Sequence, residues 1–189
     1  MARLTDAADE IVSFLLSQGW SCCIVGGMAV PRWGEPRATV DVDICLFTGL
    51  GDERSFIDQV LDKFAPRTDN AGAFAEKTRV LLVKASNGIN IDVALAWTPF
   101  EANMLSRATT HSYTAKIVLP TASAEDVIVM KAFASRPQDW VDIEGILVKQ
   151  RGRLDWDYIT HELSALCELK EAPEIVGNLQ QMRQRIDAE

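Results

Sequence analysis

Long apolar runs, an excess of basic charge and cysteines at metal-ligand spacing are all missing from this 189-residue sequence. No run reaches the roughly 20 apolar residues of a membrane-spanning helix. The first residues, MARLTDAADE, do not resemble a signal peptide. We therefore expect a cytoplasmic protein that does not enter a membrane.

Basic residues are outnumbered by acidic ones, 19 to 27, which gives a formal net charge of −8. This charge argues against broad, non-specific binding to nucleic acid, because the phosphate backbone attracts basic surfaces. A local basic groove around the end of a nucleic acid is still compatible with it.

Cysteine is scarce, and the four residues present are Cys22, Cys23, Cys45 and Cys167. Most of them lie in apolar segments with strand or helix character, and none has the spacing of a metal site. We expect buried free thiols in a reducing compartment.

The remaining composition, with 48% hydrophobic residues, is ample for a core. Alternating strand and helix patterns predict an α/β part over about 1–120, and helical patterns predict an all-helical part over 121–189. The junction around Pro120 is too short for a flexible linker, so we expect the two parts to pack together.

Local signals predict the individual elements. Helices are expected over 4–18, 28–33, 53–64, 99–107, 127–135, 137–150, 155–169 and 173–186, and strands over 21–25, 39–47, 79–85, 89–97 and 113–119. The segment 66–72 is predicted to be a polar loop. Asn87-Gly88 predicts a tight hairpin turn between the strands 79–85 and 89–97.

The central stretch, 24–47, carries two glycines, Gly26 and Gly27, and then the acids Asp41 and Asp43. Residues two apart on a strand share a face, so both carboxylates would point the same way. A divalent cation would relieve their repulsion and their loss of hydration. An exposed strand face with two solvated acids explains the pair equally simply.

A third acid, Asp92, lies in the otherwise apolar strand that follows the hairpin. Taken alone it is as compatible with a solvent-facing residue as with a site. Together with the acid pair and a glycine turn whose backbone N–H groups suit phosphate, it favours two-metal phosphoryl chemistry.

With these motifs in place, the sequence resembles the minimal nucleotidyltransferases with a polymerase-β-like fold, and most closely their AbiEii-type, toxin-like branch. The resemblance covers roughly residues 20–150. It rests on Gly26-Gly27, on Arg37-x-Thr39-x-Asp41-x-Asp43, on Ile91-Asp92-Val93 and on the run EDVIVMKAFASRPQDWVDIEGIL. It implies an α/β fold in which a small mixed β-sheet is flanked by helices, with a carboxy-terminal helical bundle.

The resemblance also implies roles for individual residues. Asp41, Asp43 and Asp92 would hold Mg²⁺, two ions in all. The NTP would be bound by Gly26, Gly27, Arg37 and Thr39, together with Lys131 and Asp142. Arg37 could instead simply pair with an acid. Lys131 matches a family lysine that faces the triphosphate, although a lysine on an apolar helix can also simply extend to solvent.

Arg136, Asp139 and Asp142 follow the family's spacing of arginine and acids. Asp139 and Asp142 are three apart and can share a helix face. Asp142 is expected to orient Lys131 or Arg136, whereas both acids could also serve only the dipole of their helix. The serine that often follows the first glycine in such enzymes is replaced by Gly27, which leaves only backbone donors for phosphate.

The predicted function is metal-dependent transfer of a nucleoside monophosphate from an NTP to an acceptor hydroxyl. The acceptor would be tRNA or another RNA, a protein or a small molecule. The protein would act as the toxin of a toxin–antitoxin pair in one version of this hypothesis, with an antitoxin as partner. The alternative is a non-catalytic module that binds a nucleotide or a partner on the same fold.

Overall fold

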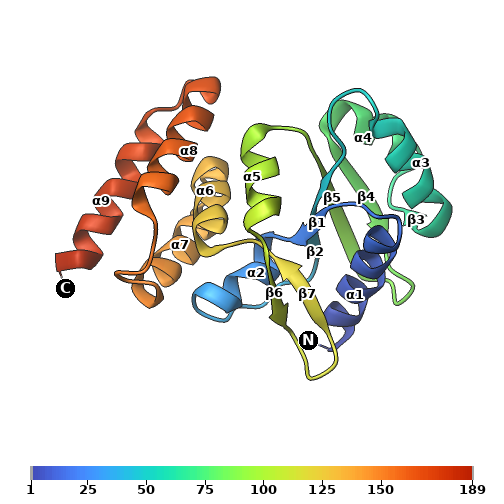
Figure 1. Ribbon diagram of the computed structural model, residues 1–189, viewed down its shortest axis with the longest axis horizontal. Helices are drawn as coiled ribbons and strands as arrows, with labels where there is room; N and C mark the ends of the chain where they lie inside the picture. The colour runs from blue at the N-terminus through green and yellow to red at the C-terminus, as the bar shows by residue number, and fades with distance from the viewer. Residues whose placement is uncertain (1, 189) are drawn as a thin grey trace. The chain divides into compact units, whose positions relative to one another are not determined.

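The computed structural model describes residues 2–188, in which strands and helices alternate up to residue 121 and only helices follow (Figure 1). The helices are α1 (Ala2–Ser17), α2 (Gly26–Trp33), α3 (Glu53–Lys63), α4 (Ala71–Thr78), α5 (Pro99–Arg107), α6 (Ala124–Ala134), α7 (Pro137–Lys149), α8 (Trp156–Lys170) and α9 (Glu174–Ala188). The strands are β1 (Cys22–Ile24), β2 (Val42–Phe47), β3 (Ala65–Pro66), β4 (Val80–Lys84), β5 (Asn90–Ala96), β6 (Thr109–Ser112) and β7 (Val118–Thr121).

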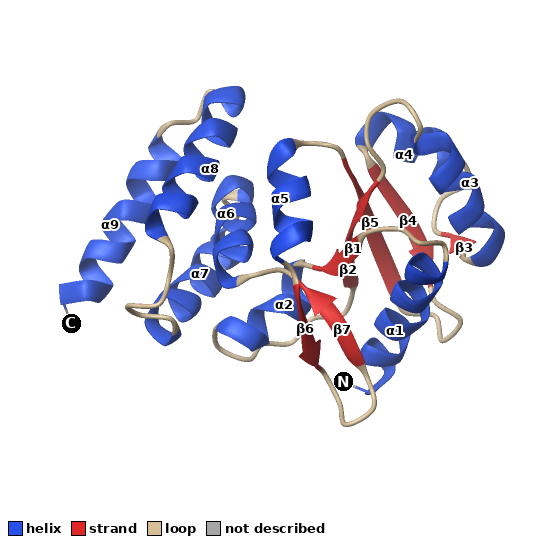
Figure 2. Ribbon diagram, viewed as in Figure 1, coloured by secondary structure: helices blue, strands red, loops and turns tan. Residues whose placement is uncertain are grey.

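The strands form one mixed sheet in the order β3-β4-β5-β2-β1-β7-β6, counted over the described residues (Figure 2). β2 runs parallel to β5, and β1 runs parallel to β7, while the other neighbours are antiparallel. The predicted fold class, a small mixed sheet with flanking helices and a helical carboxy-terminal part, is confirmed.

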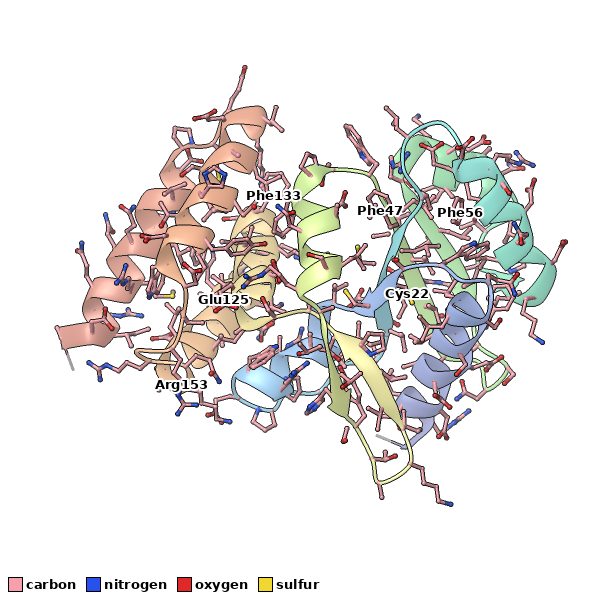
Figure 3. All side chains as sticks on the ribbon, viewed as in Figure 1. Cys22, Phe47, Phe56, Glu125, Phe133 and Arg153 are labelled. Atoms are coloured by element: carbon pink, nitrogen blue, oxygen red, sulfur yellow. The ribbon has the colours of Figure 1, made fainter. Side chains whose placement is uncertain are left out.

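One face of the sheet carries the main hydrophobic core. Alternate residues of the central strands, such as Ile44 on β2 and Val93 on β5, pack there against apolar side chains of α1, α3 and α4. The ring centroids of Trp20 and Phe56 lie 4.7 Å apart, and both residues pack against this core. Figure 3 labels Phe56, a residue of α3. Because side chains alternate along a strand, the residues between the core positions point to the opposite face.

The chain divides into two compact units. The first unit comprises 1–28 and 38–122, and the second comprises 29–37 and 123–189. The first unit contains the whole sheet, and the second contains α6 to α9 together with the segment that follows the first turn of α2.

Several predicted boundaries were wrong. The acidic strand begins at Val42, not at residue 39, and Val40, expected on the apolar face, is 74% exposed. Thr39 Oγ1 donates to Asp41 O at 3.4 Å, a local bond of the kind that competes with strand pairing. Thr39 and Asp41 therefore precede the strand.

Two further predictions needed correction. The single strand expected over 113–119 is the turn and second arm of a hairpin, β6–β7, whose first arm is the polar stretch Thr109–Ser112. Helix α4 was missed, because its eight residues, AGAFAEKT, follow a polar loop and carry little apolar periodicity.

The short helix 99–107 was predicted with its exact bounds. Pro99 lies in its first turn, and Thr98 and Glu101 form a reciprocal capping box, with Glu101 N–H donating to Thr98 Oγ1 at 3.2 Å. Helix α6 is capped by Ser123, whose side chain accepts from Asp126 N–H at 3.2 Å.

Among the described residues, no helix has both the length and the apolar character needed to cross a membrane. The four cysteines are buried thiols, as predicted. Burial raises the pKa of Cys22 to about 12 and raises that of Cys45 well above its ordinary value of 9.0. Both thiols are therefore held in the protonated, unreactive form.

We expect the native protein to react slowly with a thiol-specific disulfide reagent at pH 8, because neither the thiolate nor access is available at Cys22 and Cys45. The measurement is the time course of thiol release, with the guanidinium-unfolded protein as control, in which all four thiols should react promptly. Fast modification of the native chain at these two cysteines would contradict their burial.

Candidate functional site

The acids predicted from the sequence lie on the face of the sheet opposite the main core. Asp43 stands between Val42 and Ile44 on β2, and Asp92 stands between Ile91 and Val93 on β5; all four of these apolar residues belong to the core. The alternation of side chains therefore turns both acids to the other face.

Register brings the two acids side by side. In the parallel pairing of β2 with β5, Asp43 is the direct partner of Asp92. Adjacent strands lie about 4.8 Å apart, so the two carboxylates are neighbours although 49 positions separate them in the sequence. The structure thus joins two of the predicted acids in one place.

The Gly26–Gly27 turn packs against one of these two acids, Asp43. α2 begins at Gly26, and the Gly27 N–H donates to Asp43 Oδ2 at 3.3 Å. Gly26 has a φ of +56°, and a Cβ at this position would overlap the Asp43 carboxylate. Only glycine at position 26 lets the Asp43 carboxylate come this close to the backbone. The partial positive charge at the N-terminus of α2 stabilises this carboxylate.

The third acid of the predicted group, Asp41, is half-buried and lies one residue before β2. The alternation of the strand therefore does not dictate where its side chain points. Within residues 2–188, no three acidic, cysteine or histidine side chains are arranged to hold a metal ion together.

Asp92 has a resident partner that the sequence analysis missed. The Arg67 guanidinium forms an ion pair with the Asp92 carboxylate, and the two side chains are 23% and 36% exposed. The sequence gives no signal for this contact, because Arg67 lies in a stretch that reads as a polar loop and meets Asp92 only through strand pairing.

The donor chemistry still fits a divalent cation. Two adjacent carboxylates supply the hard oxygen ligands that Mg²⁺ prefers, and the Gly26–Gly27 turn packs against one of them, Asp43. Asp43 and Asp92 are the residues that would hold such an ion, with Asp41 next to them in the chain.

In the second unit, Lys131 is buried and fully engaged. Its Nζ donates to Asp139 Oδ1 at 3.0 Å and to Asp142 Oδ2 at 2.6 Å, and the Lys131 residue is only 5% exposed. Asp139 and Asp142 share a face of α7, as predicted. Lys131 does not extend to solvent, so the simpler reading of this lysine is excluded.

Two arginines complete this cluster. Arg37 Nε donates to Asp142 at 3.0 Å, and Arg136 Nε donates to Asp139 Oδ2 at 2.7 Å. Three cations thus surround two carboxylates, which leaves a net charge of +1. Asp142 therefore contacts Lys131, one of the two residues that it was expected to orient. The orienting role of Asp142 and the nucleotide-binding roles of Lys131, Arg37 and Asp142 stay predictions.

Two opposing effects set the pKa of Asp139. Burial acts to raise this pKa, but hydrogen bonds from Arg136 and Lys131 and the charges of both outweigh it, so the pKa falls below 3.8. At a pH above the ordinary carboxyl pKa, the ion pairs of Asp139 therefore contribute fully to the stability of the fold. This contribution is lost as the pH falls through the lowered pKa of Asp139.

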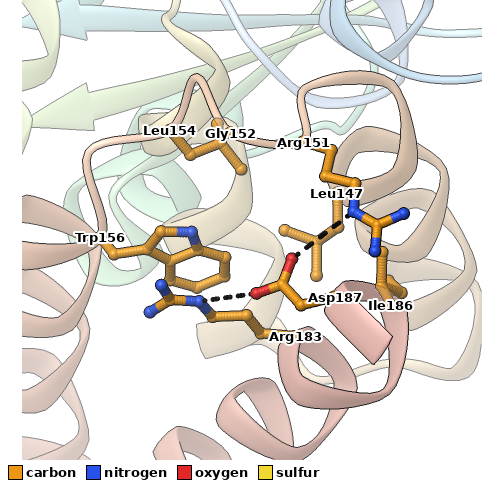
Figure 4. A pocket seen from close by; sticks show the side chains of 8 residues that line it. All are labelled: Leu147, Arg151, Gly152, Leu154, Trp156, Arg183, Ile186 and Asp187. Carbon is orange, nitrogen blue, oxygen red and sulfur yellow. Dashed lines mark hydrogen bonds and ion pairs between the residues drawn. The ribbon is translucent and has the colours of Figure 1, made fainter. Parts of the chain in front are cut away.

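A second group of charges in this unit is structural. Arg183 lies 4.2 Å above the Trp156 ring, and Asp187 pairs with Arg183 at 3.4 Å and with Arg151 at 3.9 Å (Figure 4). The arginine stacking attaches α9 to the start of α8, the Asp187–Arg151 pair attaches α9 to the segment between α7 and α8, and the Asp187–Arg183 pair lies within α9. Trp156 is thus a packing residue.

A family model described as a nucleotidyltransferase of unknown function (DUF6036) matches residues 2–182. The chain belongs to this family. The predicted resemblance to nucleotidyltransferases is confirmed at this level, while the AbiEii-type, toxin-like branch stays a prediction. Among proteins with curated functions, none matches the sequence.

Solved structures agree on the fold of this nucleotidyltransferase. A nucleotidyltransferase-like protein, an antigen of Paracoccidioides brasiliensis, aligns with a TM-score of 0.52 and 15% identity, covering 94% of this chain and 92% of its own. ANT(2")-Ia in complex with adenylyl-2"-tobramycin aligns with a TM-score of 0.50 and 17% identity, covering 98% and 99%. At these identities the likeness concerns the fold alone.

We expect Gly26→Ala to destabilise the nucleotidyltransferase by about 1–3 kcal/mol more than Gly19→Ala. Both glycines have positive φ, so both variants carry the backbone strain, but only at Gly26 does the new Cβ meet a carboxylate. Urea unfolding of the two variants gives the difference. Equal losses would mean that the contact with Asp43 carries no weight.

We expect Lys131→Met to destabilise the fold by about 2–4 kcal/mol, because two buried carboxylates each lose a charge-assisted hydrogen bond while they keep their arginine partners. The matched control is Lys77→Met, at an exposed position of α4, which should change stability by about 0.5 kcal/mol at most. Thermal unfolding of both variants measures the effect. A Lys131 variant as stable as the control would show that the cluster contributes nothing to folding.

Proposed function

We propose that this nucleotidyltransferase transfers a nucleoside monophosphate from an NTP to an acceptor hydroxyl with the help of Mg²⁺. The acceptor oxygen forms a bond to the α-phosphorus, the bond from that phosphorus to the bridging oxygen breaks, and pyrophosphate leaves. Asp43 and Asp92, with Asp41, would hold the metal, and Asp92 would receive the proton of the acceptor hydroxyl.

The observation that carries the proposal is the lateral pairing of Asp43 with Asp92 beside the Gly26–Gly27 turn. Two adjacent carboxylates repel each other, and in the folded protein the Gly27 N–H on Asp43 and the Arg67 guanidinium on Asp92 offset this repulsion. A divalent cation bound to both carboxylates would offset it directly, and it would lower the pKa of the attacking hydroxyl and stabilise the charge on the leaving group.

In this proposal the triphosphate binds at the start of α2. Backbone N–H groups at the start of α2 receive phosphate oxygens, since the first turn of a helix has donors without intrahelical acceptors. The nucleotide-binding roles of Lys131, Arg37, Asp142 and Thr39 are kept in the proposal on the sequence resemblance alone.

The fold does not identify the acceptor, so the class of acceptor must be determined by assaying transfer. One solved neighbour, ANT(2")-Ia, holds an adenylylated small molecule, adenylyl-2"-tobramycin, which supports including hydroxylated small molecules among the acceptors to be tested. RNA, including tRNA, and proteins are the other classes. A role as the toxin of a toxin–antitoxin pair, with an antitoxin as partner, is part of the proposal for each of these acceptors.

A second candidate, a non-catalytic module that binds a nucleotide or a protein partner, has one observation in its favour. Arg67 neutralises Asp92, and among residues 2–188 no trio of potential metal ligands is assembled. A protein that had given up catalysis would tolerate such an arrangement. The two candidates differ in whether a covalent product forms.

We expect the purified protein, incubated with Mg²⁺ and each α-labelled NTP, to transfer label to an acceptor in a pool of total RNA, the protein itself or small hydroxylated molecules. Asp43→Ala and Asp92→Ala should each lower the rate by at least 100-fold, because a metal ligand is lost. Asp58→Ala, which removes an exposed acid of α3, is the matched control and should keep the rate.

Label transfer that survives in both site variants would contradict the assignment of these acids. Absence of transfer to every acceptor, combined with an NTP-dependent rise in the unfolding temperature, would favour the binding module instead.

A further inference from the structure

Arg67 lies in line with the two acids of the site. Its backbone N–H donates to Leu82 O at 3.0 Å, which continues the β3–β4 ladder by one position past Pro66. Leu82 is the register partner of Asp92, and Asp92 is the partner of Asp43. The four positions therefore form one row across the sheet.

The side chains of this row also point to the same face of the sheet. Val83 on β4 points into the main core, so its neighbour Leu82 points to the acid face. Arg67 stands opposite Leu82 and carries the same orientation. Its long side chain passes over β4 and meets Asp92 there.

This ion pair engages the carboxylate that a metal ion would need. A guanidinium that donates to Asp92 Oδ1 takes up one acceptor site of that oxygen and places a positive charge next to the carboxylate, where it would repel a cation. Both side chains are mostly shielded, so water weakens the interaction less than it does for a surface pair.

We propose that Arg67 is the counter-ion of Asp92 in the metal-free protein and that a divalent cation displaces it on binding. The inference rests on the proposed use of Asp43 and Asp92 for a cation. Arg67 is a positioning residue in this scheme, because it holds the Asp92 side chain in place. It also competes with the cation for Asp92, so it raises the metal concentration needed to occupy the site.

Each acid thus has its own partner before metal arrives. Asp43 accepts from the Gly27 N–H at the start of α2, and Asp92 is paired with Arg67. Two adjacent carboxylates are tolerated in the folded protein because neither is left without a positive partner. Binding of a cation then amounts to an exchange of one positive charge for another.

The first test is the affinity for Mn²⁺, measured by isothermal titration calorimetry without nucleotide. Arg67→Ala and Arg67→Gln should bind Mn²⁺ roughly tenfold more tightly than the wild type, because a repelling charge is gone. Arg67→Lys keeps the charge and should stay within about threefold of the wild type. Arg54→Ala, which removes an arginine paired with exposed Asp58 and Glu76, is the matched control and should change nothing.

The second test uses the wild-type chain, so it does not depend on the folding of any variant. Modification of Arg67 by phenylglyoxal, followed by peptide mass spectrometry, should accelerate severalfold on saturation with Mg²⁺, while that of Arg54 should not. Unchanged or slower modification of Arg67 would overturn the proposal.

Equal or weaker Mn²⁺ binding by Arg67→Ala and Arg67→Gln, or no Mn²⁺ binding by any form, would likewise overturn it. Neither readout requires transfer of a nucleotide. Tighter Mn²⁺ binding in the variants, together with no labelled product from any acceptor, would therefore refute the proposed function and leave the role of Arg67 in place.

Discussion

The parallel pairing of β2 with β5 is the interaction on which the candidate site depends. It puts Asp43 against Asp92 and, on the other side of the same two strands, buries Ile44 against Val93. The burial of the apolar residues holds the register, because a slip of one residue would turn Asp92 into the core. The hydrophobic core therefore maintains the spacing of the two charges.

Parallel neighbours need a long connection, and the chain supplies it between β2 and β5. The segment includes α3, α4 and the hairpin that ends in β5, and both helices bury apolar residues on the core face. Asn87 and Gly88 close the hairpin, with Gly88 at a φ of +82° and Asn87 Oδ1 accepting from Ile89 N–H at 3.1 Å. The acid face is left free of these helices.

In the second unit, the main constraint is the pairing of buried charges. Lys131 and Asp142 are buried charges, which are costly unless each is paired and hydrogen-bonded. The cluster meets this condition through four hydrogen-bonding residues around the two acids of α7, namely Lys131, Arg37, Arg136 and Gln138. Arg37 also attaches the segment before the acidic strand to α7.

By itself, the sequence determined the α/β character, most helix and strand positions, the hairpin and the identity of the acids, because these follow from local periodicity, turn chemistry and residue type. It also predicted that Asp139 and Asp142 share a helix face, since a helix repeats within one segment. Only the tertiary structure decided that Asp43 faces Asp92, that Arg67 pairs with Asp92 and that Asp41 precedes the strand. These are matters of register between strands far apart in the chain, and register is set by the packing of the core, which no local pattern encodes.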